Sequence, residues 1–255
     1  MDAVLLDLPG LLMKVWWPFC RALGLLSAAP FVGEAMVPIS ARVLLALVLA
    51  LVMLPFATPA TEIEPLSLHA ALVTAEQALI GFGIGMAFHL VTSALMVLGY
   101  VLSSQMGLAM ALMNDPVNGT SSDVVSVLLY ILGALVFFAI DGHIVLAQIL
   151  GASFRNWPVG GGLGFGTFEA IAYAVGWALA AAVLLALPVV FSALVVQLGF
   201  GFLNRIAPAL NLYSLGFSAI IVFGIFVLGW LVRHVPEHYV NMTGRVLELL
   251  RPVTR

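Results

Sequence analysis

The sequence predicts an all-α protein of the integral-membrane type, with about six hydrophobic segments of the length that a bilayer requires. Of its 255 residues, 63% are hydrophobic and only 8% are Asp, Glu, Lys or Arg, whereas a typical soluble domain has about 25% charged residues. Two uncharged runs, residues 77–114 and 170–204, are far longer than the roughly 20 residues of a spanning helix. Lipid, or burial against partner subunits, is the favourable environment for so much apolar surface.

The first two segments lie at residues 10–29 and 43–61. Lys14 and Arg21 interrupt the first segment, and we expect both side chains to snorkel or to pair. Residues 61–67 then form a polar, acidic loop.

Residues 77–114 would measure about 57 Å as one helix at roughly 1.5 Å per residue, which exceeds a hydrocarbon core of about 30 Å. The run is therefore either a long helix that leaves the bilayer or a broken hairpin. Gly81 and Gly85 favour the close approach of another helix. Residues 114–123, NDPVNGTSSD, are the strongest turn signal in the chain.

The second half continues with residues 124–154, interrupted at Asp141-Gly142-His143, a glycine-rich connector at 155–166, and the runs 170–204 and 206–232. Helix bends are predicted at Gly142, Pro188 and Pro208.

The C-terminal tail has a different pattern. Tyr239, Met242, Val246 and Leu250 recur at three- and four-residue spacing, which predicts a short amphipathic helix. We therefore divide the chain into a hydrophobic helical domain, residues 1–235, and a tail, residues 236–255.

Motifs for catalysis or nucleotide binding are missing from the sequence. Cys20 is the only cysteine, which excludes an internal disulfide and a cysteine-based zinc site. A net charge of −3 without a basic patch does not suggest nucleic acid. We expect no enzymatic activity, cofactor or metal site.

Ionisable residues within the apolar runs allow two interpretations. Asp141, His143 and Glu76 would suit a secondary transporter for a small solute, since charges at membrane depth are usually functional. We favour local pairing at a helix bend for Asp141 and His143. We also expect either Arg42 or Arg205 to pair with Glu76 and so to hold helices in register.

Met106, Met110 and Met113 fall on one face at helical spacing, just before the 114–123 turn. Such a methionine stripe is either core packing or a flexible seal for a pore.

Several segments, in this order, resemble the FliR family of flagellar biosynthetic proteins, the T-type subunit of type III secretion export gates. They are FVGEAMVPISARVLLAL at 31–47, GFGIGMAF at 81–88, GYVLSSQMGLAMALMNDP at 99–116, FFAIDGHIVLAQILGASFRNWPVG at 137–160, and LALPVVFSALVVQLGFGFLNRIAPALNLYSLGF at 185–217. Length, number of segments and order of motifs agree over nearly the whole chain.

The resemblance implies long bent helical hairpins in a non-enzymatic gate subunit. Its partners would be FliP-like and FliQ-like subunits and an FlhB-like switch protein, and unfolded export substrates would pass through the shared pore. The gate would belong to the flagellar basal body in the bacterial inner membrane, with much of the ring raised towards the periplasm. We favour a flagellar over an injection apparatus on overall similarity.

In the family, the loop after the third long helix helps to plug the pore, and residues 106–122 match its position here. The implied plug residues are Met106, Met110, Met113, Asn114, Asp115, Pro116, Asn118 and Gly119.

Overall fold

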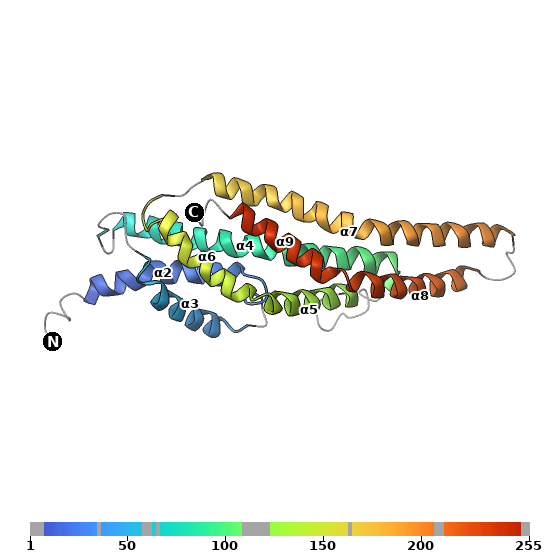
Figure 1. Ribbon diagram of the computed structural model, residues 1–255, viewed down its shortest axis with the longest axis horizontal. Coiled ribbons are helices and arrows are strands. Elements are labelled where there is room, and N and C mark those ends of the chain that lie inside the picture. Colours follow the sequence, from blue (N-terminus) through green and yellow to red (C-terminus); the bar gives the residue numbers. More distant parts are fainter. Residues whose placement is uncertain are drawn as a thin grey trace. The chain divides into compact units, whose positions relative to one another are not determined.

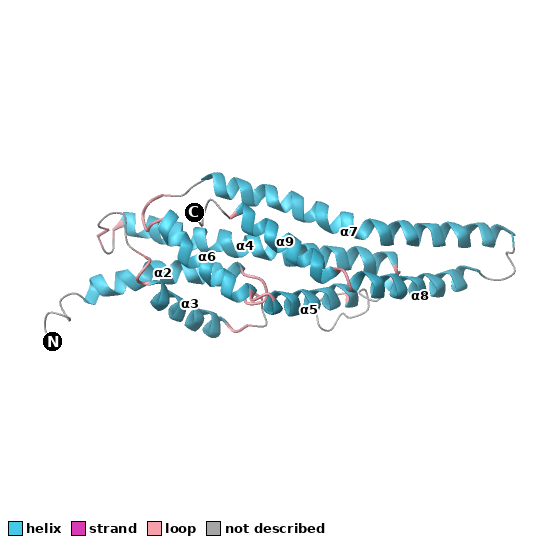
Figure 2. Cartoon of the chain, in the orientation of Figure 1, coloured by secondary structure: helices cyan, strands magenta, loops and turns pink. Residues whose placement is uncertain are grey.

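A computed structural model describes most of the chain, namely residues 8–34, 37–57, 63–64, 67–108, 123–162, 165–206 and 212–250. Within these ranges the regular structure consists of eight α-helices without a β-strand (Figures 1 and 2). The helices are α2 (Leu8–Ala28), α3 (Ile39–Met53), α4 (Leu68–Gln105), α5 (Val124–Ala139), α6 (Gly142–Asn156), α7 (Phe165–Ile206), α8 (Leu212–Val232) and α9 (Val235–Leu249). The all-α prediction is confirmed.

Two of these helices, α4 and α7, are long and apolar enough to cross a membrane alone. Two further pairs qualify when each is taken as one bent span: α5 with α6, and residues 218–232 of α8 with α9. The bends are 64° and 52°. The described helices thus provide two to four candidate spans, which fits helical hairpins of the membrane type.

Residues 77–105 of the uncharged run lie in one continuous helix, α4, which is not broken within these residues. The helix begins before the run, at Leu68, because the hydroxyl of Ser67 accepts a 3.0 Å hydrogen bond from the Ala70 N–H and caps the first turn. It ends just before Gly107, whose φ of 72° lies in the left-handed region that favours glycine.

The break between α5 and α6 falls at Ile140 and Asp141, where Asp141 has a left-handed φ of 55°. Gly142 begins α6, and a Cβ on it would collide with the ring of Phe137. Pro188 lies inside the continuous helix α7, so a bend at this residue stays a prediction. Pro208 lies outside the described residues.

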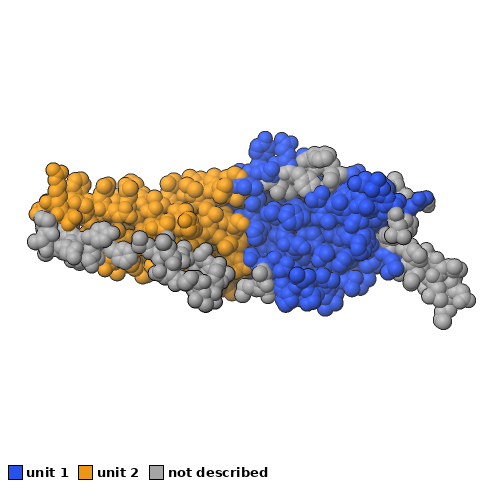
Figure 3. All heavy atoms as spheres, turned by 180° about the vertical axis from the view of Figure 1, so that it is seen from behind, with its two compact units in different colours: residues 1–90, 137–175, 242–255 blue, residues 91–136, 176–241 orange. Residues whose placement is uncertain are grey.

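The chain divides into two compact units (Figure 3). Unit 1 contains residues 1–90, 137–175 and 242–255, and unit 2 contains residues 91–136 and 176–241. The separation of residues 236–255 as a tail stays a prediction.

In unit 1, α2 and the first half of α4 pack at very short range through glycines. A Cβ on Gly81 would overlap the carbonyl oxygen of Arg21, and one on Gly85 would overlap that of Leu25. From the other side, a Cβ on Gly24 would overlap the carbonyl oxygen of Ala78. The predicted close approach at Gly81 and Gly85 is confirmed, with α2 as the partner helix.

The amphipathic prediction for the C-terminal residues is also confirmed. Tyr239, Met242 and Val246 of α9, and Leu250 after it, are all buried. Since exposed and half-exposed residues separate them, one face of α9 packs against protein and the other faces outward.

Helix α7 leaves most of its apolar surface uncovered. Only 22% of its most apolar window is buried, against 67% for α4. Large side chains such as Phe191 and Phe202 are exposed. A helix this apolar needs lipid or another subunit on its outer surface.

Substitution of Gly81 by Ala should destabilise the protein by about 1–3 kcal/mol, because the methyl group would force apart two backbones that already touch. The thermal unfolding midpoint of the purified protein in mild detergent measures the effect.

Gly199→Ala in α7 is the matched control, since nothing lies within 4 Å of a Cβ there. It should leave stability unchanged or raise it by up to about 1 kcal/mol, because alanine favours helix more than glycine. Equal effects at both positions would contradict the packing described here.

Candidate functional site

Residues 106–122, here named the 106–122 loop, connect α4 to α5, and the structure describes the residues that hold both of its ends. The two helices lie antiparallel in unit 2. A Cβ on Gly99 would overlap the backbone of Ser126, while one on Gly133 would lie 2.9 Å from the Leu95 side chain. The second half of α4 and α5 therefore form a helical hairpin.

Met106 holds the first end of the loop. Its side chain is 2% exposed and packs against Gly224 of α8, where any Cβ would overlap it. Gly107 then turns the chain with its positive φ. Of the predicted methionine stripe, Met106 is thus a packed core residue at the base of the loop.

The remaining predicted plug residues lie outside the described residues. They are Met110, Met113, Asn114, Asp115, Pro116, Asn118 and Gly119.

Asp123 holds the second end of the loop, and sequence reasoning did not single it out. Its carboxylate is buried and accepts a 2.8 Å hydrogen bond from the Ser126 N–H, which caps α5. The Ser126 hydroxyl lies 2.6 Å from the second carboxylate oxygen and 3.0 Å from the Met96 carbonyl oxygen, and shares its proton between them. The first turn of α5 is thereby bonded to α4.

A second polar cluster lies in unit 1 around Arg21, whose side chain is completely buried. Its Nε and Nη2 atoms both donate to Oε1 of Gln77, at 2.8 and 2.5 Å. Nη1 donates to the Ser153 hydroxyl at 3.0 Å, and Nη2 donates to the Trp157 carbonyl oxygen at 2.8 Å. The guanidinium carbon also lies 4.0 Å above the ring centre of Phe154.

Glu76 extends this Arg21 cluster. Its carboxylate accepts a 3.3 Å hydrogen bond from the Gln77 amide, and it also accepts one from the Gly162 N–H. The cluster thus joins α2, α4 and α6 to both ends of the connector at 157–162. Arg21 was expected either to snorkel or to pair, and the structure shows it paired. Its partners could not be identified from the sequence, since two of them, Gln77 and Ser153, are uncharged side chains far away in the chain.

Arg42 and Arg205 were considered as alternative partners of Glu76. Arg42 donates through Nη2 to the carbonyl oxygens of Glu34 and Val37, and so holds the turn before α3. Arg205 is exposed near the end of α7. Glu76 is instead linked to Arg21 through Gln77.

Asp141 and His143 are exposed at the break between α5 and α6. The His143 ring lies 5.7 Å from the ring of Phe138, while the Asp141 carbonyl oxygen accepts from the Ile144 N–H at 2.8 Å. In the part of the chain that the structure describes, no group of three or more His, Cys, Asp or Glu residues could hold a metal ion.

Comparison with known proteins gives a consistent result. Residues 12–246 match the family model described as bacterial export proteins, family 1. The chain is 31% identical to the flagellar biosynthetic protein FliR of Pectobacterium carotovorum, over 97% of this chain and 95% of that protein. It is 28% identical to FliR of Escherichia coli, over 93% and 91% of the two chains. FliR of Aquifex aeolicus is 26% identical over 82% of this chain.

Arg21→Met should destabilise the protein by about 3 kcal/mol or more, because it leaves the Gln77, Ser153 and Trp157 oxygens buried without their donor. Arg21→Lys should recover little, since an ammonium cannot reproduce the planar fork of donors. Thermal unfolding in detergent measures both variants.

Lys14→Met is the control for Arg21, as Lys14 is an exposed basic residue two turns earlier in the same helix. It should change stability by less than about 0.5 kcal/mol. A loss as large as that of Arg21→Met would show that the Arg21 cluster is not the cause.

Asp123→Ala should cost about 0.5–2 kcal/mol, the usual value of a helix N-cap, and speed amide exchange in the first turn of α5. Hydrogen–deuterium exchange of residues 124–128 measures this. Asp123→Asn keeps an acceptor at the cap and should stay close to the natural protein. If residues 124–128 of the alanine variant exchanged at the same rate as in the natural protein, Asp123 would not be the residue that holds this end of the loop.

Proposed function

Because the chain belongs to family 1 of the bacterial export proteins, with FliR proteins as its relatives, we propose that it forms part of the pore of the flagellar protein export gate. That it is a subunit of the flagellar export apparatus follows from the relatives themselves, which match nearly end to end. The finer role, a structural and gating element of a pore for unfolded substrates, is our proposal.

We propose FliP-like and FliQ-like subunits as partners in the pore, and an FlhB-like switch protein at its entrance. The exposed apolar residues of α7 support this proposal, since a helix of this composition needs a covering surface. The site of assembly is the bacterial inner membrane at the flagellar basal body, with the gate raised towards the periplasm. The role is non-enzymatic.

The observation that carries the gating proposal is the fixed base of the 106–122 loop. Met106 is buried against α8, and Asp123 is bonded into the first turn of α5. A loop whose two ends are held by packed helices can cover a pore in one position. Its middle can be displaced when a substrate passes, while its two ends stay in place. Methionine side chains at its first half would give an adaptable apolar seal.

A secondary transporter built on Asp141, His143 and Glu76 is not favoured. Its relatives would be transporters, whereas those of this chain are flagellar biosynthetic proteins. Glu76 is engaged in the Arg21 cluster, and Asp141 and His143 are exposed at a helix break.

Deletion of Asn118–Ser122 should make the assembled gate leak ions, because a shortened loop no longer fills the closed pore. Conductance of the reconstituted complex in planar bilayers measures the leak. The loop ends at Met106 and Asp123 remain, so α4, α5 and α8 keep their packing.

Replacement of the same five residues by glycine and serine is the control, since it keeps the loop length. Copurification with the FliP-like and FliQ-like subunits must be equal for all variants before conductance is compared. If the deletion variant assembles and its conductance is unchanged, the 106–122 loop is not the plug. If the natural protein itself does not copurify with the FliP-like and FliQ-like subunits, the proposed gate assembly is wrong.

A further inference from the structure

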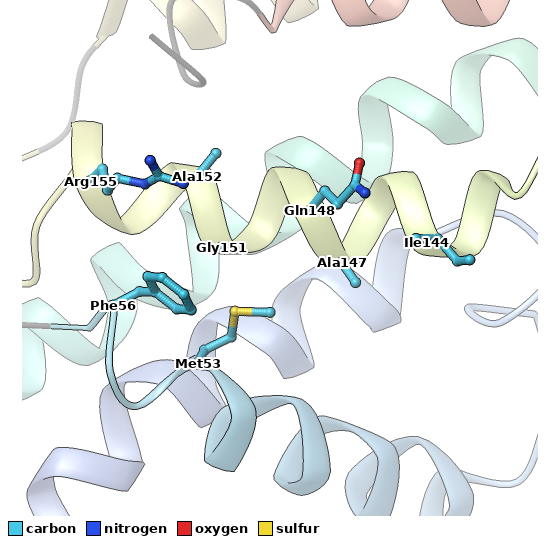
Figure 4. A pocket seen from close by; sticks show the side chains of 8 residues that line it. All are labelled: Met53, Phe56, Ile144, Ala147, Gln148, Gly151, Ala152 and Arg155. Carbon is cyan, nitrogen blue, oxygen red and sulfur yellow. The ribbon is translucent and has the colours of Figure 1, made fainter.

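Unit 1 contains a groove between the end of α3 and one face of α6, with a volume of about 320 Å³ (Figure 4). Eight residues line it: Met53, Phe56, Ile144, Ala147, Gln148, Gly151, Ala152 and Arg155. The groove belongs neither to the 106–122 loop nor to the Arg21 cluster.

Small residues on α6 make room for the groove. Gly151 is buried next to the thioether of Met53, and a Cβ at Gly151 would lie 3.2 Å from that sulfur. Ala147 and Ala152 lie near it on the same helix, and Figure 4 shows Phe56 and Met53 on the side of α6 to which Ala147 points. This part of the groove offers a purely apolar surface.

Two polar side chains complete the lining. Gln148 and Arg155 are both exposed and lie seven residues apart on α6, which is about 10 Å along the helix. Arg155 is the only charged residue among the eight, and none of them is acidic. The groove therefore has an apolar floor and a single positive charge near the last turn of α6.

The α3 wall has an apolar outer surface. Leu44, Leu47, Val48, Leu51 and Val52 of α3 are all exposed. A hydrocarbon chain in the groove would therefore lie beside a helix that already needs a hydrocarbon environment.

We propose that this groove binds one phospholipid with an anionic headgroup. One acyl chain would lie on the floor formed by Met53, Phe56 and Gly151, and the phosphate would lie at Arg155, with Gln148 as a neutral hydrogen-bond donor. Guanidinium groups suit phosphate oxygens because two N–H groups can donate in parallel. A soluble anion would leave the apolar floor uncovered, and a zwitterionic lipid such as phosphatidylcholine would bring a choline ammonium group, a second positive charge, beside Arg155. The proposal does not depend on the gating function.

The test is native mass spectrometry of the full chain, purified with its partner subunits in mild detergent and titrated with palmitoyl-oleoyl phosphatidylglycerol or phosphatidylcholine. The natural protein should retain more phosphatidylglycerol. Arg155→Gln should weaken its binding by roughly tenfold, the order expected from the loss of one charge-assisted hydrogen bond. Arg205→Gln, which changes another exposed arginine outside the groove, should not alter binding.

Filling the groove should abolish binding of both lipids. Gly151→Leu does this most directly, and Ala152→Leu serves if the first variant fails to assemble. Equal retention of the two lipids by the natural protein, or equal affinity of Arg155→Gln and Arg205→Gln for phosphatidylglycerol, would overturn the proposal. Capture of a partner subunit rather than lipid by a photo-crosslinker at Gln148 would do the same.

Discussion

Unit 1 depends on the burial of one guanidinium group. Arg21 is completely enclosed, and four of its five N–H groups donate to described acceptors. Such a charge is tolerated among apolar helices only if its donors are satisfied, so α2, α4 and α6 must keep their mutual positions. The glycines allow this geometry, because Gly81 lies against the carbonyl oxygen of Arg21 itself. The close approach of α2 and α4 at Gly81 and the hydrogen bonds of Arg21 therefore involve the same residue of α2.

A different constraint acts in unit 2. There the α4–α5 hairpin is held by the close crossing at Gly99 and by the shared hydroxyl of Ser126. These contacts end where the 106–122 loop begins, and Asp123 is the last residue that they fix. The described residues at both ends of this connection are therefore bonded to or packed against the helices on either side of it.

Much of the fold could be predicted from the sequence, because apolar runs and turn signals act locally. The amphipathic spacing of Tyr239, Met242 and Val246 identified the buried face of α9. The partners of Arg21 could not be predicted, since Gln77 and Ser153 are 56 and 132 residues away and carry no charge. The role of Asp123 could not be predicted for a related reason. In the sequence Asp123 is the last residue of a turn signal, whereas in the structure its carboxylate accepts from Ser126, whose hydroxyl also contacts the Met96 carbonyl oxygen of α4.

The exposed apolar side chains show which parts of the chain need a covering surface that the chain itself does not supply. Helix α4 is mostly covered by its own chain, whereas α7 exposes aliphatic and aromatic side chains along its length. The 63% hydrophobic composition therefore cannot be explained by an internal core alone. In α6, by contrast, small residues leave a groove open, and even a Cβ at Gly151 would press on the Met53 sulfur at 3.2 Å. Under the two proposals made above, α7 would supply the surface for partner subunits, and the narrow groove beside Arg155 would supply a separate place for a lipid.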